Sequence, residues 1–447
     1  MSDAVYTDLA HIVSTLAGTA NSSGSDNATG ADARFHDPQD ITFGNNGLYV
    51  SETGNHMIRR IEFLPEGKVT RIAGNGSTGE QDGTGTQARF NYPQGITYSN
   101  GNIYVSDGSN NRIRKVTPEG VVTTFAGTNQ GTNDGTGTNA QFYAPLGIAS
   151  DSNGNLYVVD TNNHTIRKIT PQAVVTTFAG LATNSGFVDG TGDEARFFHP
   201  VGITVDSNNN VYVVDTNNSA IRKITPEGVV TTLARNGVNG VQFGSPRYID
   251  VDSQGNLYIS DTSWHTIRKL TPDGELTDLA GANEQSGSED GVTTSAKFQN
   301  PQGIALDGND RIYVADQNNH TIRKIMLGGN GDLTEADFAF SISGGNATLL
   351  NETPTSISKN DNVYTFGISL SGTPNGEETV RINPLINAIF NSKGNAATSN
   401  QNFNSVKLNE KVPPTISSLA LASDNSNLDV TFNEAVYNSN SASGALE

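Results

Sequence analysis

The sequence contains no cysteine among its 447 residues, and it has only one tryptophan. Disulfide bonds and thiolate ligands for a metal are therefore excluded, which rules out the small disulfide-stabilised class of secreted domain. No apolar run approaches the roughly 18 residues of a membrane-spanning helix. The first 13 residues lack the basic and apolar regions of a signal peptide. We therefore expect any export signal to lie outside this sequence.

Basic residues are also scarce. The chain has 27 Lys and Arg against 46 Asp and Glu, so its formal net charge is -19. A strongly anionic surface opposes binding to phosphate backbones and to anionic lipid. The composition thus argues against a nucleic-acid partner and gives no reason to expect membrane insertion.

What the sequence does contain is one motif written six times. The third copy reads YVVDTNNHTIRKI, and the copies are separated by 46 to 55 residues. The six copies begin at Tyr49, Tyr104, Tyr157, Tyr212, Tyr258 and Tyr313. A fixed period of this size in a chain rich in Gly, Asn and Thr is typical of a solenoid or a propeller.

Each repeat divides into four short strands, which we name a to d. In the third copy these are residues 147–150, 156–160, 165–169 and 174–180, separated by turns rich in Gly, Asn and Pro. Four antiparallel strands per repeat predict one propeller blade. The sixth copy ends at Ile325 without a strand d, whereas residues 11–18 (HIVSTLAG) match strand d alone. We therefore expect the N-terminal strand to complete blade six and to cover an edge that could otherwise aggregate.

The pattern of Pro and Gly-Ile opening a strand, then YVxD, NHxIRKI and VTTxAG, resembles the NHL repeat family from about residue 11 to about residue 326. This resemblance implies an all-β, six-bladed propeller over residues 1–326. It implies a binding platform more often than a particular chemistry.

After residue 326 the pattern changes to longer alternating strands, which favour an antiparallel sandwich. Residues 327–411 resemble the Ig-like repeats of bacterial surface proteins, so we expect an Ig-like β-sandwich there. Residues 412–447 either begin a second Ig-like module or supply the strands that complete the first. The sequence leaves both alternatives open.

Strand parity places the loops from d to a and from b to c on one side of the ring, which we call the long-loop face. Histidine recurs in the b to c loop, and DGTG recurs in the d to a loop. Loops of separate blades cannot easily bring four histidines to one metal ion, so we interpret the histidines and the acid of YVxD as structural. Each DGTG offers too few oxygens for calcium and predicts an Asx turn. The AxF pairs that follow, such as Ala195 and Phe197, predict hydrophobic plugs between blades.

Two acidic residues interrupt the neutral lining expected around the central axis. Asp40 replaces a glycine in blade one, and Asp250 replaces Thr or Ala in blade five. Two carboxylates could hold a divalent cation such as Ca²⁺ together with water. Propeller lactonases and lyases organise their chemistry near this axis, but the inner strands lack a matching set of Glu, Asn and His. A solvated tunnel mouth is the alternative interpretation.

One inter-blade stretch, ARNGVNGVQFGSPRY between Leu233 and Ile249, is shorter than the others. Unusual side chains lie within and beside it, so we predict a notch with an aromatic platform and positive charge, suited to a sugar acid or a peptide carboxylate. The alternative is that this repeat has simply diverged in sequence, and that the tryptophan covers core residues that the shorter loop leaves exposed. The candidate ligand-binding residues are Trp264, His265, Arg235, Arg247 and Tyr248.

Together these features favour a monomeric, non-catalytic bacterial protein, extracellular or on the cell surface. We expect its propeller to bind a carbohydrate or a protein through the long-loop face, with the Ig-like part as a stalk. The scarcity of aromatic residues in the long loops weakens the carbohydrate version. The competing hypothesis is a lactonase-like hydrolase or lyase with a divalent ion in the tunnel.

Overall fold

A computed structural model of the chain describes residues 11–44, 47–63, 66–307 and 311–327. Beyond them it describes short segments at 338–343, 348–350, 353, 355–360, 363–367, 370–371, 379–384, 390–391, 416–421, 427–432 and 436–437. The chain divides into two compact units, Val13–Met326 and a second unit made of Met1–Ile12 with Leu327–Glu447. Within the described residues no helix is long and apolar enough to cross a membrane.

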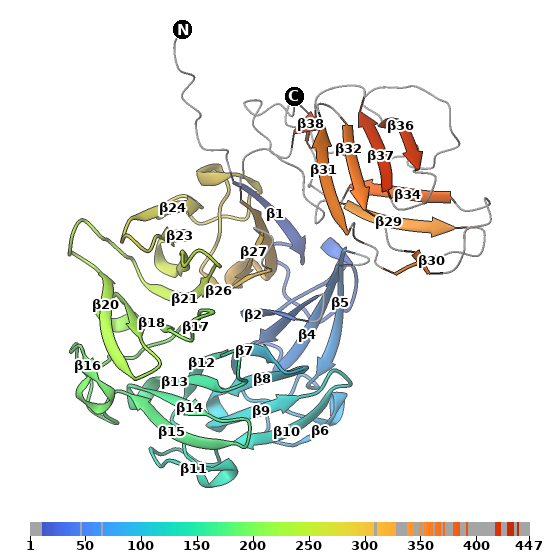
Figure 1. The fold of residues 1–447 in the computed structure, drawn as a ribbon. Helices are drawn as coiled ribbons and strands as arrows, with labels where there is room; N and C mark the ends of the chain where they lie inside the picture. Colours follow the sequence, from blue (N-terminus) through green and yellow to red (C-terminus); the bar gives the residue numbers. More distant parts are fainter. Residues whose placement is uncertain are drawn as a thin grey trace. The chain divides into compact units, whose positions relative to one another are not determined.

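Six antiparallel sheets follow one another around a ring in the first unit, coloured from blue to gold in Figure 1. Blade 1 consists of β2 (Pro38–Gly44), β3 (Gly47–Glu52), β4 (Met57–Phe63) and β5 (Glu66–Ala73). Blade 2 consists of β7 (Pro93–Ser99), β8 (Asn102–Asp107), β9 (Arg112–Val116) and β10 (Val121–Ala126). Blade 3 consists of β12 (Pro145–Ser150), β13 (Leu156–Asp160), β14 (Thr165–Ile169) and β15 (Val174–Ala179). Blade 4 consists of β17 (Ile203–Val205), β18 (Val211–Asp215), β19 (Ala220–Ile224) and β20 (Val229–Arg235). Blade 5 consists of β21 (Pro246–Val251), β22 (Leu257–Asp261), β23 (Thr266–Leu270) and β24 (Leu276–Ala280). Blade 6 consists of β26 (Pro301–Leu306), β27 (Arg311–Asp316), β28 (Thr321–Met326) and β1 (Ile12–Ala17). The prediction of an all-β, six-bladed propeller is confirmed.

Strand β1 occupies the fourth position of blade 6, where it pairs with β28. Its outer neighbour is the two-residue strand β25 (Gly291–Val292). The N-terminal strand and the last repeat are therefore parts of one sheet.

Four of the long d to a loops add a fifth strand and a short 3-10 helix to the next blade. The added strands are β6 (Gly83–Thr84), β11 (Gly135–Thr136), β16 (Gly190–Thr191) and β25. The helices of the d to a loops are η1 (Gly30–Asp32), η2 (Gly85–Gln87), η4 (Gly137–Asn139), η6 (Gly192–Glu194) and η9 (Thr293–Ser295). The b to c loops contain η3 (Gly108–Asn110), η5 (Thr161–Asn163), η7 (Thr216–Asn218), η8 (Thr262–Trp264) and η10 (Gln317–Asn319).

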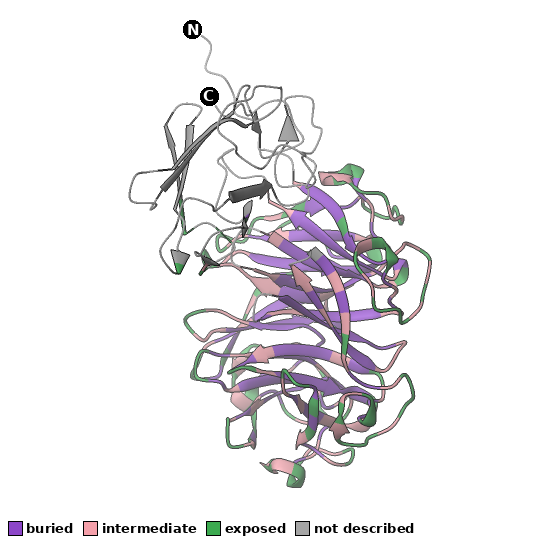
Figure 2. Ribbon diagram, turned by 90° about the vertical axis from the view of Figure 1, so that its right-hand side faces the viewer, coloured by how far each residue is buried: buried purple, intermediate pink, exposed green. Residues whose placement is uncertain are grey.

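The middle strands are buried on both sides because each blade packs between two others. All five residues of β13 are buried, whereas only two of the six residues of the outer strand β15 are buried. Figure 2 shows this as purple strands and green loops. A strand covered on both faces is selected for continuous apolar character, which explains the LYVVD pattern.

The AxF pairs lie between blades, as the sequence predicts. Ala195 and Phe197 are fully buried and pack against Val159 of blade 3 and Val213 of blade 4. Equivalent pairs are buried between the other blades, for example Ala88 with Phe90. Each plug therefore belongs to a hydrophobic cluster shared by two neighbouring blades.

The second unit is described as strands only. They are β29 (Phe338–Ser343), β30 (Thr348–Leu349), β31 (Ser356–Asn360), β32 (Val363–Gly367), β33 (Leu370–Ser371), β34 (Thr379–Pro384), β35 (Phe390–Asn391), β36 (Ile416–Leu421), β37 (Asn427–Phe432) and β38 (Val436–Tyr437). The order β31-β32-β37-β36 is antiparallel throughout. In this sheet β32 pairs with β37, and such a pairing is expected if residues 412–447 supply strands to the first sandwich. The assignment to the Ig-like class stays a prediction, and residues 412–415 and 438–447 lie outside the described residues.

Candidate functional site

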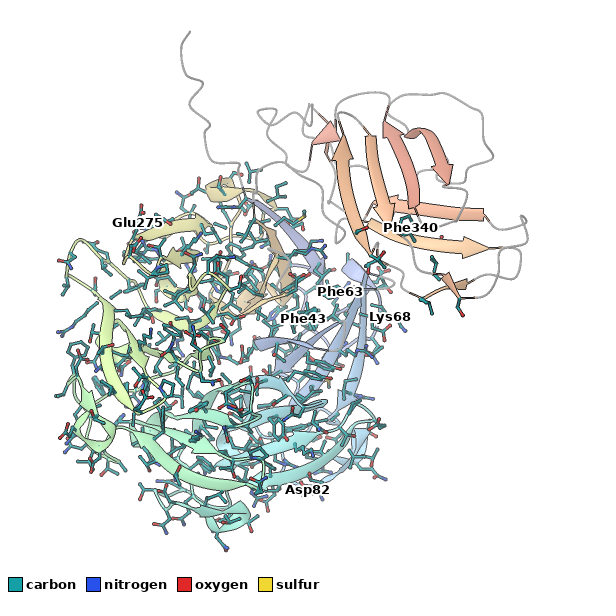
Figure 3. The ribbon with its side chains drawn as sticks, viewed as in Figure 1. Phe43, Phe63, Lys68, Asp82, Glu275 and Phe340 are labelled. Carbon is teal, nitrogen blue, oxygen red and sulfur yellow. The ribbon has the colours of Figure 1, made fainter. Side chains whose placement is uncertain are left out.

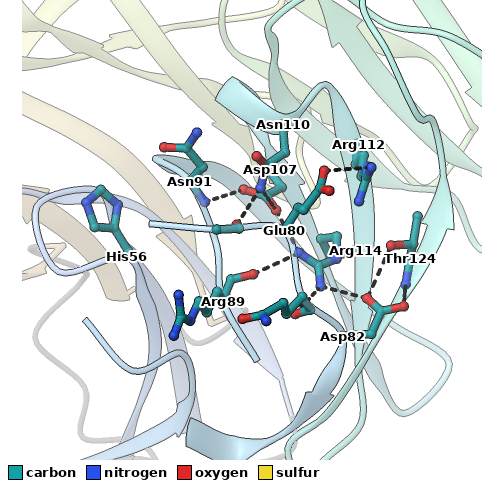
Figure 4. Close-up of polar contacts among 12 residues, drawn as sticks. His56, Glu80, Asp82, Arg89, Asn91, Asp107, Asn110, Arg112, Arg114 and Thr124 are labelled. Atoms are coloured by element: carbon teal, nitrogen blue, oxygen red, sulfur yellow. Dashed lines mark hydrogen bonds and ion pairs between the residues drawn. The ribbon is translucent and has the colours of Figure 1, made fainter. Parts of the chain in front are cut away.

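The most regular polar feature is a buried ionic network inside each blade, shown for blade 2 in Figure 4. Arg114 on β9 is fully buried, and its Nη1 donates to Asp107 Oδ2 at 2.8 Å. Asn110 donates to the same oxygen, and the backbone N–H of Asn91 donates to Asp107 Oδ1 at 2.7 Å. Asp107 thus accepts three hydrogen bonds, which offset the cost of burying its charge.

The same pair recurs in every blade. The six pairs are Glu52–Arg59, Asp107–Arg114, Asp160–Arg167, Asp215–Arg222, Asp261–Arg268 and Asp316–Arg323. Burial raises the pKa of Glu52 to about 7 and that of Asp160 to about 6, while the paired arginine acts in the opposite direction. The structural interpretation of the YVxD acid is confirmed. The strand-c arginine was not singled out from sequence, although its repetition at a buried position was the available signal.

The DGTG aspartates have a different role from the expected Asx turn. Asp82 Oδ1 accepts a hydrogen bond from Arg114 at 2.7 Å, and Asp82 Oδ2 accepts one from the backbone N–H of Thr124 at 3.0 Å. Asp134 and Asp189 bind the arginines of blades 3 and 4 in the same way. The Asx-turn prediction is therefore wrong, because these carboxylates tie the inserted loop to the outer strand of the following blade. Figure 3 labels Asp82 on the propeller.

The recurring histidines link consecutive blades on the long-loop face. Each has a left-handed backbone conformation, as His164 does with φ 60°. His164 Nδ1 accepts a hydrogen bond from the backbone N–H of His199 at 3.2 Å, and His56 accepts one from Tyr92 at 3.2 Å. In blade 2, Asn111 Oδ1 accepts the equivalent bond from Ala144 at 2.8 Å. The structural interpretation of the histidines is confirmed, with partners that come from the next blade.

This arrangement predicts acid sensitivity. An acceptor Nδ1 must be unprotonated, and burial is the main cause that lowers the pKa of His56, His164, His265 and His320. With a lowered pKa in the folded state, the unfolded chain binds protons more readily, so this stabilisation is complete above about pH 6.5 and is lost as pH falls below it.

Replacing all four histidines with asparagine should flatten the acid side of the stability profile. Asparagine tolerates the left-handed conformation and keeps the acceptor, as Asn111 does. We expect urea-unfolding midpoints of the wild type to fall more steeply than those of the variant between pH 7.5 and pH 5. Parallel profiles would show that the histidine bonds contribute nothing to the pH dependence.

The central tunnel contains a cavity of about 250 Å³ lined by the inner strands. Asp40 and Asp250 both line it, as the sequence predicts. Asp40 accepts hydrogen bonds from the backbone N–H of Ile96 at 3.0 Å and from that of Ile41 at 2.9 Å. Asp250 accepts from Thr204 Oγ1 at 2.9 Å and from Leu306 N at 2.8 Å. Burial raises the pKa of both carboxyls.

These two carboxylates form a small donor set. Among the residues that the structure describes, no group of three or more His, Cys, Asp or Glu side chains is placed to hold a metal. Calcium takes six to eight oxygen ligands. A cation in the tunnel would therefore need most of its ligands from water.

The five residues predicted to form a notch have different surroundings. Tyr248 is buried on β21, lines the tunnel cavity and accepts a hydrogen bond from Gln39 Nε2 at 3.0 Å. Arg235 stacks on Phe187, with 3.9 Å between Arg235 Cζ and the ring centroid. Trp264 at the end of η8 packs near Gly244 and the guanidinium of Arg268. His265 follows η8, and Arg247 lies at the start of β21.

An arc of exposed aromatic side chains on the long-loop face was not predicted. Tyr92 is 50% exposed, Tyr143 is 36% exposed and Phe198 is 38% exposed. They lie just before the inner strands of blades 2, 3 and 4, in equivalent stretches of three consecutive d to a loops. We call these three residues the aromatic arc. The sequence signal was an aromatic residue one or two positions after the plug phenylalanine.

Comparisons with known proteins agree with this fold. The NHL repeat model matches residues 90–116, 142–169, 197–224 and 298–325, so the chain carries NHL repeats on a six-bladed propeller. Protein SUPPRESSOR OF QUENCHING 1, chloroplastic, of Arabidopsis thaliana is 27% identical over 330 residues, which cover 69% of this chain. The chain spans only 27% of that relative's length.

Solved structures also resemble the propeller. A Bacteroides thetaiotaomicron structural genomics protein of unknown function matches with a TM-score of 0.55 and 22% identity, covering 72% of this chain and 76% of that one. An auxiliary nutrient binding protein from Bacteroides ovatus matches with a TM-score of 0.54 and 17% identity, covering 71% of this chain and 76% of that one. At these identities the likeness concerns the fold.

Proposed function

We propose that this chain is a non-catalytic binding protein, acting outside the cell or at its surface, whose long-loop face binds a carbohydrate or protein ligand. The aromatic arc carries this proposal. Exposed aromatic rings supply large apolar contact area at low conformational cost, and they dominate the energetics of many binding surfaces. In this proposal the chain acts as a monomer and its C-terminal unit serves as an Ig-like stalk.

Backbone hydrogen bonds and ring contacts hold two members of the arc in place. Tyr92 donates its backbone N–H to His56 Nδ1, and the two rings meet edge to face with centroids 4.8 Å apart. Phe198 donates its backbone N–H to Asp215 at 2.8 Å, and its ring lies 5.9 Å from that of His164. Side chains that are already ordered lose less entropy on binding.

Residues beside the shortened loop extend the proposed surface. Strand parity places Trp264, His265, Arg235 and the start of β21 on the long-loop face with the arc. Cationic groups there would favour a ligand carboxylate. Tyr248 is buried and would act only through the tunnel lining.

The solved neighbour described as a nutrient binding protein shares the propeller fold. That likeness is compatible with ligand binding by this chain and supports no particular ligand. The negative charge of the chain favours a neutral or cationic surface on the partner.

A second candidate function is a hydrolase or lyase that uses a divalent ion in the tunnel. It is favoured by one observation, that Asp40 and Asp250 line the same cavity. Its weakness is the small donor set, because backbone N–H groups already occupy lone pairs of both carboxylates.

A binding screen with matched variants tests the proposal. We would screen neutral and acidic glycans and peptides, then measure affinities for the triple variant Y92A/Y143A/F198A. Truncating central aromatic contacts costs about 2 kcal/mol or more, so affinity should fall at least about tenfold. The control V121A/V174A/V229A removes three exposed apolar residues from outer strands and should bind normally. Equal affinity for the arc variant, with binding lost in D40N/D250N, would contradict the proposal and favour the tunnel.

A further inference from the structure

A second cavity of about 280 Å³ lies between blades 4 and 5. It is lined by the a to b turns of both blades and by the c to d turn of blade 5, so it opens away from the long-loop face. We call it the seam groove. Its polar lining includes Asn208, Lys223 and Gln254, and its apolar lining includes Leu233 and Leu257.

Strand d of blade 4 differs from that of blades 2 and 3 at one position that lines the groove. In blades 2 and 3, the strand-d phenylalanine covers the strand-b tyrosine, with Tyr104 and Phe125 centroids 5.0 Å apart and Tyr157 and Phe178 centroids 5.2 Å apart. Blade 4 has Leu233 at this position, and it is 40% exposed. The smaller side chain leaves space beside Tyr212 that a phenylalanine ring occupies in the preceding blades.

The shortened inter-blade loop opens the same seam further. Between blades 3 and 4, the inserted loop docks on the c to d turn, where Gly192 N donates to Gly228 O at 3.0 Å. Blade 5 has no fifth strand, and a Cβ added to Gly274 in its c to d turn would meet nothing within 4 Å. The short loop therefore leaves a groove on the face opposite to the one where the notch was predicted.

The groove combines an apolar floor with side-chain donors and acceptors at its rim. The ammonium of Lys223 lies 5.6 Å from the centroid of the Tyr212 ring. Within the described residues this ammonium makes no hydrogen bond or ion pair. Asp206 is occupied by its own turn, accepting from Asn210 N at 2.8 Å and from the Tyr212 hydroxyl at 3.0 Å. Lys223 is thus the charged donor available to a ligand.

We propose that the seam groove binds one ring of a neutral sugar. A sugar ring has an apolar C–H face for Leu233 and Leu257, and hydroxyls that can accept from Lys223 and donate to amide or carboxylate oxygens. The groove is slightly smaller than the roughly 300–1,000 Å³ of pockets for drug-sized ligands, which fits a ligand of one ring. Nearby Asp206 and Asp252 disfavour an anionic ligand. The site is independent of the long-loop face.

The test is saturation-transfer NMR and calorimetry on the full chain with glucose, galactose, mannose, xylose and N-acetylglucosamine. We expect saturable binding of at least one sugar, weakened at least tenfold by L233F, which introduces the residue that blades 2 and 3 carry. K223A should also weaken binding, and it serves as the second variant if L233F does not fold. The arc variant Y92A/Y143A/F198A should bind the sugar normally.

Two results would overturn the proposal. One is the absence of binding by all five sugars. The other is binding that L233F and K223A leave unchanged while both variants melt like the wild type. Sugar binding that is lost in the arc variant and retained in L233F would place the site on the long-loop face, and would support the proposed function while refuting this inference.

Discussion

Replacing Arg114 with methionine is expected to destabilise the propeller by about 3–5 kcal/mol, because it leaves the buried carboxylate of Asp107 without its cation. Arg114 also donates to the backbone carbonyls of Arg89 at 3.0 Å and Gln81 at 2.9 Å. The substitution therefore removes the tie between the inserted loop and the blade together with the ion pair.

The matched control is D82N on the exposed side of the same arginine. Blade 1 naturally has Asn27 in this place, where it accepts from Arg59 at 3.0 Å. Exposed ion pairs contribute about 0–1 kcal/mol, so D82N should stay within about 1 kcal/mol of the wild type. Urea unfolding followed by Trp264 fluorescence reports on the propeller alone, since this is the chain's one tryptophan. Equal losses in the two variants would contradict the structural account of the network.

Deleting residues 1–18 is expected to have the largest effect of all. It removes β1, whose Ile12, Val13 and Leu16 side chains are buried, each contributing about 1.5–3 kcal/mol. It also exposes the hydrogen-bonding edge of β28, which invites aggregation.

Deletion of residues 1–10 is the control, because it leaves β1 whole. Thermal melting and size-exclusion chromatography should show an aggregated or partly unfolded protein for the longer deletion and a wild-type profile for the shorter one. A monomeric 19–447 fragment with an unchanged melting temperature would show that β1 does not hold the ring together.

The repeat made the propeller predictable because blade geometry depends on residues that recur in every copy. Strand b is mostly apolar and ends in an acid, turns carry Asn and Gly, and an AxF pair fills five of the six seams, with Val241 and Phe243 in the sixth. The histidines were interpreted correctly as structural because equivalent loops of a ring belong to separate blades. The Asx turn failed because the partner of Asp82, Arg114, lies 32 residues away in sequence, and local turn chemistry does not reveal a long-range ion pair.

Features that break the repeat were harder to interpret. The short loop before blade 5 was visible in the sequence. The space beside it also depends on Leu233, which replaces the phenylalanine that blades 2 and 3 have at this position of strand d. Tyr248 was grouped with Trp264 by proximity in sequence, whereas the strand turns its side chain toward the tunnel. The aromatic arc was missed because its three members lie in different loops and share only their position relative to each blade.

Hydrogen exchange on the protein with its best ligand from the screen tests the central claim most directly. The account predicts slower exchange at residues 90–93, 142–145 and 197–200 on the long-loop face, with little change along strands β2 and β21. Protection confined to the tunnel strands around Asp40 and Asp250, with none in those three loops, would contradict it.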